Sequence, residues 1–222
     1  YDISSKKLTE VASSTVDLLL PSGAEKLDYV LYTDESPYKM QREWLDQLPF
    51  DVYSVNVHTG AKRLIGRSYR TAPKWSVNGK WAVMYDPIAQ VWNKFDGATG
   101  KVVNISDAIG YPMFMESYDK PAPAPAYGIA GWTADGNHVF LYDAYDWWKV
   151  DLTGERQPEC LTKGYGRKHG KSIRKMTSNI DKDVFQKDEK VIVSLWDKDT
   201  MDEGVYQLDM KGRLRKLMEG NY

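Results

Sequence analysis

Acid–base or nucleophilic chemistry in this sequence would have to come from three histidines, one cysteine and a small set of aspartates. The histidines are His58, His138 and His169, and each lies beside a predicted turn or loop, outside any recognisable triad context. Cys160 has no histidine near it in sequence to activate its thiol, so we expect it to be inert. A single cysteine also excludes an internal disulfide framework and any multi-cysteine metal site.

Three aspartates, Asp86, Asp143 and Asp146, are the candidates for carboxylates that work as a pair on one substrate. Asp86 and Asp143 recur at one position of an internal repeat, which favours carboxylates that accept hydrogen bonds and fix strand ends or turns. The acidic clusters at 181–183 and 197–199 lack the glycine and the distal glutamate of an EF-hand loop, so we expect exposed turns there. The expectation is therefore no catalytic residue, no metal and no cofactor in this chain.

The elements that position these residues follow from a repeat between 73–86 and 130–143. Trp75 and Trp132 are offset by 57 residues, and the same offset relates Gly79 to Gly136. Asn-Gly and Asp-Gly dipeptides at these glycines suit the central positions of a type I′ turn. Each segment therefore predicts a tight β-hairpin.

A second hairpin follows each of these two, and its pattern occurs twice more in the chain. The turn glycines fall at positions 60, 100, 154 and 212, with variable loops between the units. Four antiparallel strands per unit, repeated at this spacing, are typical of β-propeller blades. We therefore predict an all-β chain, a partial β-propeller of about four four-stranded antiparallel blades, truncated at the N-terminal side.

The predicted boundaries follow the same units. They are a blade remnant at 1–9, a blade at 10–66 with an insertion at 36–49, a blade at 67–110, a blade at 111–163 with a Pro-rich connector, and a blade at 164–222 preceded by a basic loop. A short helix is expected at 42–45 inside the insertion. The variable spacing is tolerated because the entropy of loop closure grows slowly with length.

Composition bounds the function. The chain has 222 residues, 42% of them hydrophobic, and a formal net charge of −1, which gives no global reason to expect nucleic-acid binding. No stretch approaches the roughly 18 apolar residues of a membrane-spanning helix, so we expect a soluble chain with no membrane partner. The unpaired edges of an interrupted ring predict self-association.

The residues at 141–151, followed by those at 161–168, resemble the propeller domain of prolyl oligopeptidase-family serine peptidases, in particular secreted or periplasmic bacterial members. The resemblance implies a propeller that caps an α/β-hydrolase domain and restricts which peptides reach it. That catalytic domain, encoded in the same gene product, and a peptide substrate are then the expected partners. No Gly-x-Ser-x-Gly nucleophile elbow occurs in this sequence, so the acyl transfer is not expected here.

Two segments are candidates for substrate or domain contact. Glu43 and Trp44 lie in the insertion from which, by resemblance, dipeptidyl-peptidase relatives present acidic residues to a substrate amino terminus. Arg167, Lys168 and Lys171 lie in a basic segment that has no acidic residue between 160 and 180. This segment could steer anionic groups or could simply be a solvated loop. The alternatives left open for the chain are an autonomous TolB-like propeller that binds a protein, and a propeller enzyme that uses its own carboxylates.

Overall fold

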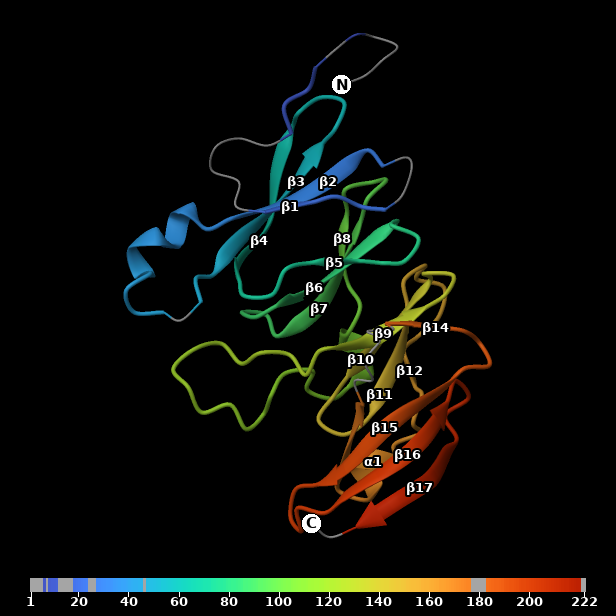
Figure 1. Cartoon of the computed structure of the whole chain (residues 1–222). Coiled ribbons are helices and arrows are strands. Elements are labelled where there is room, and N and C mark those ends of the chain that lie inside the picture. The colour runs from blue at the N-terminus through green and yellow to red at the C-terminus, as the bar shows by residue number, and fades with distance from the viewer. Residues whose placement is uncertain are drawn as a thin grey trace. The chain divides into compact units, whose positions relative to one another are not determined.

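Short antiparallel strands joined by tight turns make up nearly all regular structure in the computed structural model, which describes residues 6, 8–11, 18–23, 27–45, 47–176 and 183–220 (Figure 1). The chain divides into two units, residues 1–104 and 105–222, each with its own pair of sheets. The described part of the chain thus contains four sheets, each built on four antiparallel strands. The predicted all-β chain of four-stranded propeller blades is confirmed. Most of the predicted remnant at 1–9 lies outside the described residues.

The first unit contains two meander sheets in sequential order. The first sheet consists of β1 (Leu18–Leu20), β2 (Tyr29–Asp34), β3 (Phe50–Asn56) and β4 (Lys62–Tyr69). The second consists of β5 (Lys74–Trp75), β6 (Trp81–Asp86), β7 (Val91–Asp96) and β8 (Val102–Asn104). Inward-facing residues of both sheets form one apolar cluster, which includes Val52, Met84 and Phe95.

The second unit repeats this plan with one addition. Its first sheet consists of β9 (Ile129–Thr133), β10 (His138–Tyr142), β11 (Trp147–Asp151) and β12 (Glu159–Cys160). Its second sheet consists of β13 (Lys171–Lys175), β15 (Lys190–Asp197), β16 (Glu203–Asp209) and β17 (Leu214–Gly220). The added strand, β14 (Val184–Phe185), pairs in parallel with β9 and makes the first sheet five-stranded. It covers an edge that would otherwise expose unpaired backbone groups.

The core of the second unit lies between its two sheets. Alternate residues of β15, namely Val191, Val193 and Leu195, point inward as the two-residue period of a strand requires. They pack in the same cluster as Phe140 and Trp147 of the facing sheet. Burial of these apolar side chains from both sheets stabilises the pair as one unit.

The predicted hairpins are confirmed, but their turns differ from the expected type. The N–H of Gly79 donates to the carbonyl of Ser76 over 2.8 Å, and Gly136 makes the equivalent bond to Thr133. Only the glycines, at φ +67° and +69°, adopt positive φ, whereas a type I′ turn requires it of the preceding residue as well. Instead, Asp135 accepts hydrogen bonds from the Asn137 N–H and the Thr133 hydroxyl, and so holds its turn with its side chain.

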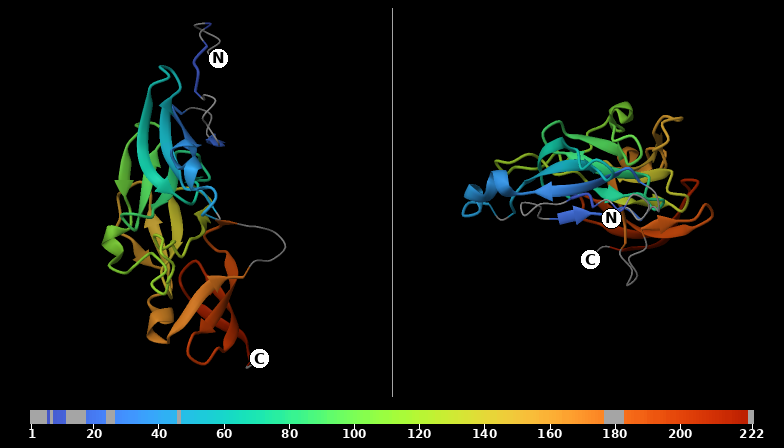
Figure 2. Two further views of the ribbon diagram at one scale, coloured as in Figure 1. Left: turned by 90° about the vertical axis from the view of Figure 1, so that its left-hand side faces the viewer. Right: turned by 90° about the horizontal axis from the view of Figure 1, so that it is seen from above.

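The two segments outside the sheet pattern also differ from expectation. The helix in the insertion is η1 (Ser36–Gln41), so it precedes the predicted 42–45, because Pro37 suits a first helical turn. The basic segment is not a loop: it forms α1 (Tyr165–Lys168) followed directly by β13, as the orange segment of Figure 2 shows. A further short helix, η2 (Asp107–Ile109), precedes β9. No helix in the described ranges is long and apolar enough to cross a membrane.

Candidate ligand-binding pocket

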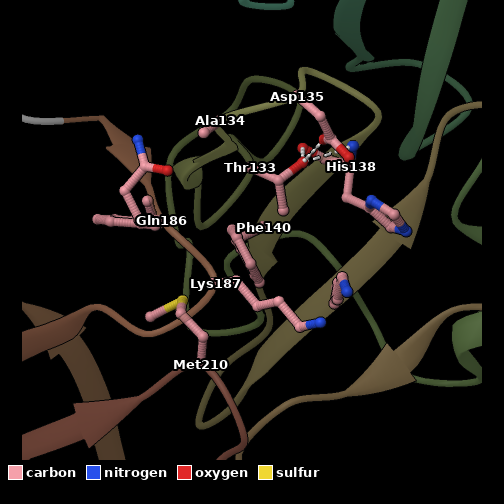
Figure 3. A pocket seen from close by; sticks show the side chains of 10 residues that line it. Thr133, Ala134, Asp135, His138, Phe140, Gln186, Lys187 and Met210 are labelled. Carbon is pink, nitrogen blue, oxygen red and sulfur yellow. Dashed lines mark hydrogen bonds between the residues drawn. The ribbon is translucent and has the colours of Figure 1, made fainter.

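A pocket of about 340 Å³ lies in the second unit, beside the β9–β10 hairpin. Its walls come from that hairpin, from β11, from β14 and the turn after it, and from the turn between β16 and β17. Figure 3 shows Phe140 in its middle, with Gln186 and Met210 to one side and Asp135 and His138 to the other. Three segments far apart in the sequence, 133–149, 185–187 and the turn at Met210, therefore supply one lining.

The apolar part of the lining consists of Phe140, Phe185 and Met210. The two phenylalanine rings lie with their centroids 5.7 Å apart, and Met210 packs against the same cluster. β14 delivers Phe185 to this place because its pairing with β9 sets Phe185 opposite Thr133. The approach is close, since a Cβ on Gly131 would lie 2.6 Å from both the Asp183 carbonyl oxygen and the Phe185 ring. Glycine at position 131 is thus a requirement of the pocket wall.

The polar rim includes two lysines. Lys149 lies directly across from Phe140 in the β10–β11 ladder, and Lys187 follows β14 by two residues. Neither ammonium group forms an ion pair with a carboxylate among the residues that the structure describes. The carboxylate of Asp135 in the lining accepts hydrogen bonds within its own turn. The two lysine ammonium groups are therefore the charged groups available to a ligand.

His138 contributes a neutral ring to this rim. Burial lowers its pKa, and the nearby charge of Lys149 lowers it further, while Asp151 and Asp135 act in the opposite direction. Its Nδ1 atom is buried and finds no hydrogen-bond partner in the described part of the chain. The ring is uncharged at neutral pH, so the charge of the rim is set by the lysines and Asp135.

A second polar feature of this unit is a buried carboxylate network at the β10–β11 turn. Asp143 accepts hydrogen bonds from the N–H groups of Tyr145 and Asp146 at 2.7 and 2.6 Å. Asp146 in turn accepts from the Thr162 hydroxyl and the Gly166 N–H at 2.6 and 2.9 Å. The contacts of Asp143 agree with the prediction that it accepts hydrogen bonds which fix a turn. Asp86 does the same for the N–H groups of Ile88 and Ala89.

Two arginines complete this network. Arg167 donates to Asp143 over 3.0 Å, and its guanidinium lies 3.9 Å from the centre of the Tyr111 ring. Arg174 donates to the backbone carbonyls of Asp143 and Ala144 and lies 4.7 Å from the Tyr142 ring. The network therefore fastens β13 and α1 to the turn of the neighbouring sheet.

The residues predicted to make substrate or domain contacts fall in two places. Glu43 and Trp44 lie in the exposed turn after η1, and 77% of the Trp44 surface is exposed. Arg167 and Lys168 lie on α1, and Lys171 begins β13. Lys168 is exposed, whereas the Arg167 side chain is engaged with Asp143 inside the unit.

The other candidate groups are engaged in local structure. His58 lies 3.0 Å from Asp28, and His169 stacks on Tyr165 with a centroid distance of 4.3 Å, both exposed as expected. Burial raises the pKa of the Cys160 thiol, whose sulfur accepts a hydrogen bond from the Gly164 N–H. Among the described residues, no group of three or more histidine, cysteine or acidic side chains could hold a metal ion.

The pocket was not among the sites predicted from the sequence. Part of it was accessible to sequence reasoning, because the predicted hairpin at 130–143 contains Thr133, Asp135, His138 and Phe140 of the lining. The rest depends on β14, a two-residue strand that pairs with a distant partner in parallel. Its residues carry no periodic pattern long enough to indicate a strand.

No protein-family model matches the chain, and no curated protein sequence matches it. Similar solved structures include TolB from Acinetobacter baumannii, at 14% identity over 96% of this chain and 46% of that chain, with a TM-score of 0.42. The β-propeller domain of the Trilobed protease from Pyrococcus furiosus is 13% identical over 93% of this chain and 59% of that one, at a TM-score of 0.44.

Acylaminoacyl peptidase from Pyrococcus horikoshii is also similar, at 13% identity over 90% of this chain and 32% of that chain, with a TM-score of 0.42. The chain thus spans less than two thirds of the length of each of these three proteins. The similar structures include TolB proteins as well as propellers of peptidases. The blade topology given above, and not these similarities, is the basis of the fold assignment.

Proposed function

We propose that this chain is the non-catalytic propeller portion of a prolyl-oligopeptidase-type serine peptidase, which controls the access of peptides to a catalytic domain elsewhere in the same gene product. The observation that carries the proposal is the pocket beside the β9–β10 hairpin. Its Thr133 and Asp135 side chains are engaged in the hairpin turn, and its remaining groups are apolar side chains, two lysines, a glutamine amide and the ring of His138. Such a lining binds an amphiphilic segment and holds it without reacting with it.

The resemblance to the peptidase family supports the same proposal. The segment that carries it, residues 141–151, contains the turn that the buried carboxylates hold rigid and also Lys149 of the pocket rim. A rigid turn next to a binding pocket suits a domain that selects peptides by size and chemistry.

The test is active-site labelling of the full gene product and of this chain, each with a fluorophosphonate probe for reactive serines. We expect one serine of the full product to be labelled, at a position outside residues 1–222, and this chain alone to remain unlabelled. A heat-denatured sample of each protein controls for non-specific reaction. Labelling of this chain, or a full product without any reactive serine, would overturn the proposal.

A second candidate is an autonomous TolB-like module that binds a protein partner. The observation that favours it is the insertion around η1, where Met40 and Trp44 are 83% and 77% exposed. Large apolar side chains held on a projecting segment suit burial against another protein. A full product that lacks a reactive serine, together with a binding partner lost on substitution of Trp44 by alanine, would favour this candidate.

A further inference from the structure

We infer that the pocket beside the β9–β10 hairpin binds the C-terminal residue of a peptide whose last side chain is apolar. At about 340 Å³ the pocket lies at the lower end of the roughly 300–1,000 Å³ typical of small-ligand sites. Space of this size suits one terminal residue and the amide group before it. The inference deepens the proposed function, since it rests on a peptide being the ligand.

The apolar side chain has a matching surface in the floor of the pocket. Phe140 and Phe185 give this floor a fixed shape because both rings belong to the buried core between the two sheets. Met210 comes from the β16–β17 turn and adds a flexible thioether side chain, which adapts to ligands of different shape. The floor therefore selects for apolar character more than for one particular side chain.

The carboxylate has its counterpart in Lys149 and Lys187. Lys149 is half-buried, so its charge is less screened by solvent than that of an exposed lysine. Its field reaches Asp135, whose pKa is lowered first by the Thr133 hydroxyl and, among further causes, by Lys149. With Asp135 negative, two lysines positive and His138 neutral, the lining carries one net positive charge and attracts a single carboxylate.

The amide group of the peptide has a partner in Gln186. Its side chain is exposed and lines the pocket next to Phe185, and a glutamine amide both donates and accepts hydrogen bonds, as a peptide group requires. A fatty acid would supply the carboxylate and the apolar chain but has no peptide group to exchange hydrogen bonds with this amide. This feature makes a peptide the better match.

Calorimetric titration of the protein with small ligands tests the inference. The ligands are N-acetyl-Gly-Leu with a free carboxylate, the same dipeptide as its C-terminal amide, N-acetyl-Gly-Gly, and hexanoate. We expect the free acid of N-acetyl-Gly-Leu to bind at least about tenfold more tightly than each of the other three. Equal binding of the amide would overturn the role of the lysines, and equal binding of hexanoate would overturn the peptide as ligand.

Substitutions place the binding in this pocket. Lys149→Gln and Lys187→Gln should each weaken binding of the free acid by at least about fivefold, while Lys101→Gln, an exposed lysine of the first unit, leaves it unchanged. Thermal melts of all three variants confirm that the fold is intact. Unchanged binding in both pocket variants would overturn the inference.

These outcomes are separate from the test of the proposed function. Serine labelling reports on another part of the gene product and does not depend on the pocket. A labelled full product together with an empty pocket would refute this inference and leave the peptidase role standing. A full product without a reactive serine, together with a pocket that binds the peptide, would refute the peptidase role alone.

Discussion

The guanidinium of Arg167 lies 3.0 Å from a carboxylate oxygen of Asp143, a residue that is wholly buried at the β10–β11 turn. Burial is the largest single effect on Arg167 and lowers its pKa. The hydrogen bond to Asp143 and the negative charge of that carboxylate act in the opposite direction and, together with smaller effects, leave the pKa of Arg167 raised. The arginine comes from α1, which precedes β13 of the second sheet, so the pair joins this helix to the β10–β11 turn of the first sheet. Arg167, which in the sequence is one charge of a basic segment, is thus the ion-pair partner of a buried carboxylate.

Replacing Arg167 by alanine should lower the free energy of unfolding by about 2–4 kcal/mol, because a buried carboxylate then loses its charged partner. Chemical denaturation followed by tryptophan fluorescence measures the change. Lys168→Ala, the next and exposed residue of the same helix, is the matched control and should change stability by less than about 0.5 kcal/mol. Equal effects of the two substitutions would contradict the structural role of the pair.

The two repeat tryptophans should contribute strongly to stability. Trp132 is only 5% exposed, and we expect Trp132→Ala to cost about 3–5 kcal/mol. Trp75 is half-buried and donates from its ring nitrogen to the Leu20 carbonyl over 3.0 Å, so Trp75→Ala should cost about 2–4 kcal/mol. Urea denaturation measures both losses, with the exposed Trp44→Ala as the control. A cost below about 0.5 kcal/mol at either repeat position would mean that its indole is not part of the packing.

His138 should make the stability depend on pH between about 5 and 7. Its pKa in the folded chain is lowered from the ordinary 6.5, first by burial. As the pH falls below 6.5, the unfolded chain therefore binds a proton that folded His138 does not, and the free energy of unfolding decreases. The slope from this residue is at most about 1.4 kcal/mol per pH unit.

Denaturation at several pH values isolates this effect. His138→Gln should flatten the slope between pH 5 and 7, whereas His58→Gln, at an exposed histidine, should retain it. Asp135 and Asp151 also have lowered pKa values, and they add a loss of stability with the same sign near and below pH 3.8. A slope unaffected by the removal of His138 would show that its ring is free to take up a proton in the folded chain.

Electrostatic steering by the basic segment remains a prediction, now confined to the exposed Lys168 and the half-buried Lys171. Lys168→Glu and Lys171→Glu together should slow peptide turnover by the full gene product at low salt. The defect should shrink as ionic strength passes about 0.15 M, where the Debye length is roughly 8 Å. Arg167 is left unchanged in this test, because its replacement would also break the pair with Asp143. Kinetics independent of both lysines at low salt would identify the segment as a solvated surface.

Local sequence signals predicted most of the fold because each blade is built from neighbours in sequence. The turn glycines at 60, 100, 154 and 212 all adopt positive φ, between +67° and +85°, as their repeat position indicates. The hairpins at 76–81 and 133–138 also formed where the Asn-Gly and Asp-Gly dipeptides predicted them. Turn chemistry and alternation act over a few residues, so they can be read directly from the sequence.

Contacts between distant segments account for what the sequence did not reveal. The basic sequence of β13 does not indicate a strand, because its charged side chains are paired with distant residues. Arg174 donates to the backbone carbonyls of Asp143 and Ala144, and Lys175 forms an ion pair with Asp183. The pocket likewise needs β14 beside β9, and Gly131 to admit it. Such requirements are set by the tertiary arrangement and leave no pattern in the local sequence.

The environment of Cys160 has a practical consequence. Its thiol is half-buried on β12, accepts a hydrogen bond from the Gly164 N–H and has a raised pKa, so little of it is thiolate at neutral pH. Alkylation of the native protein should therefore be slow and should accelerate when β12 separates from β11. Since the sequence contains no other cysteine, the rate of modification reports the opening of this outer strand without any engineered label.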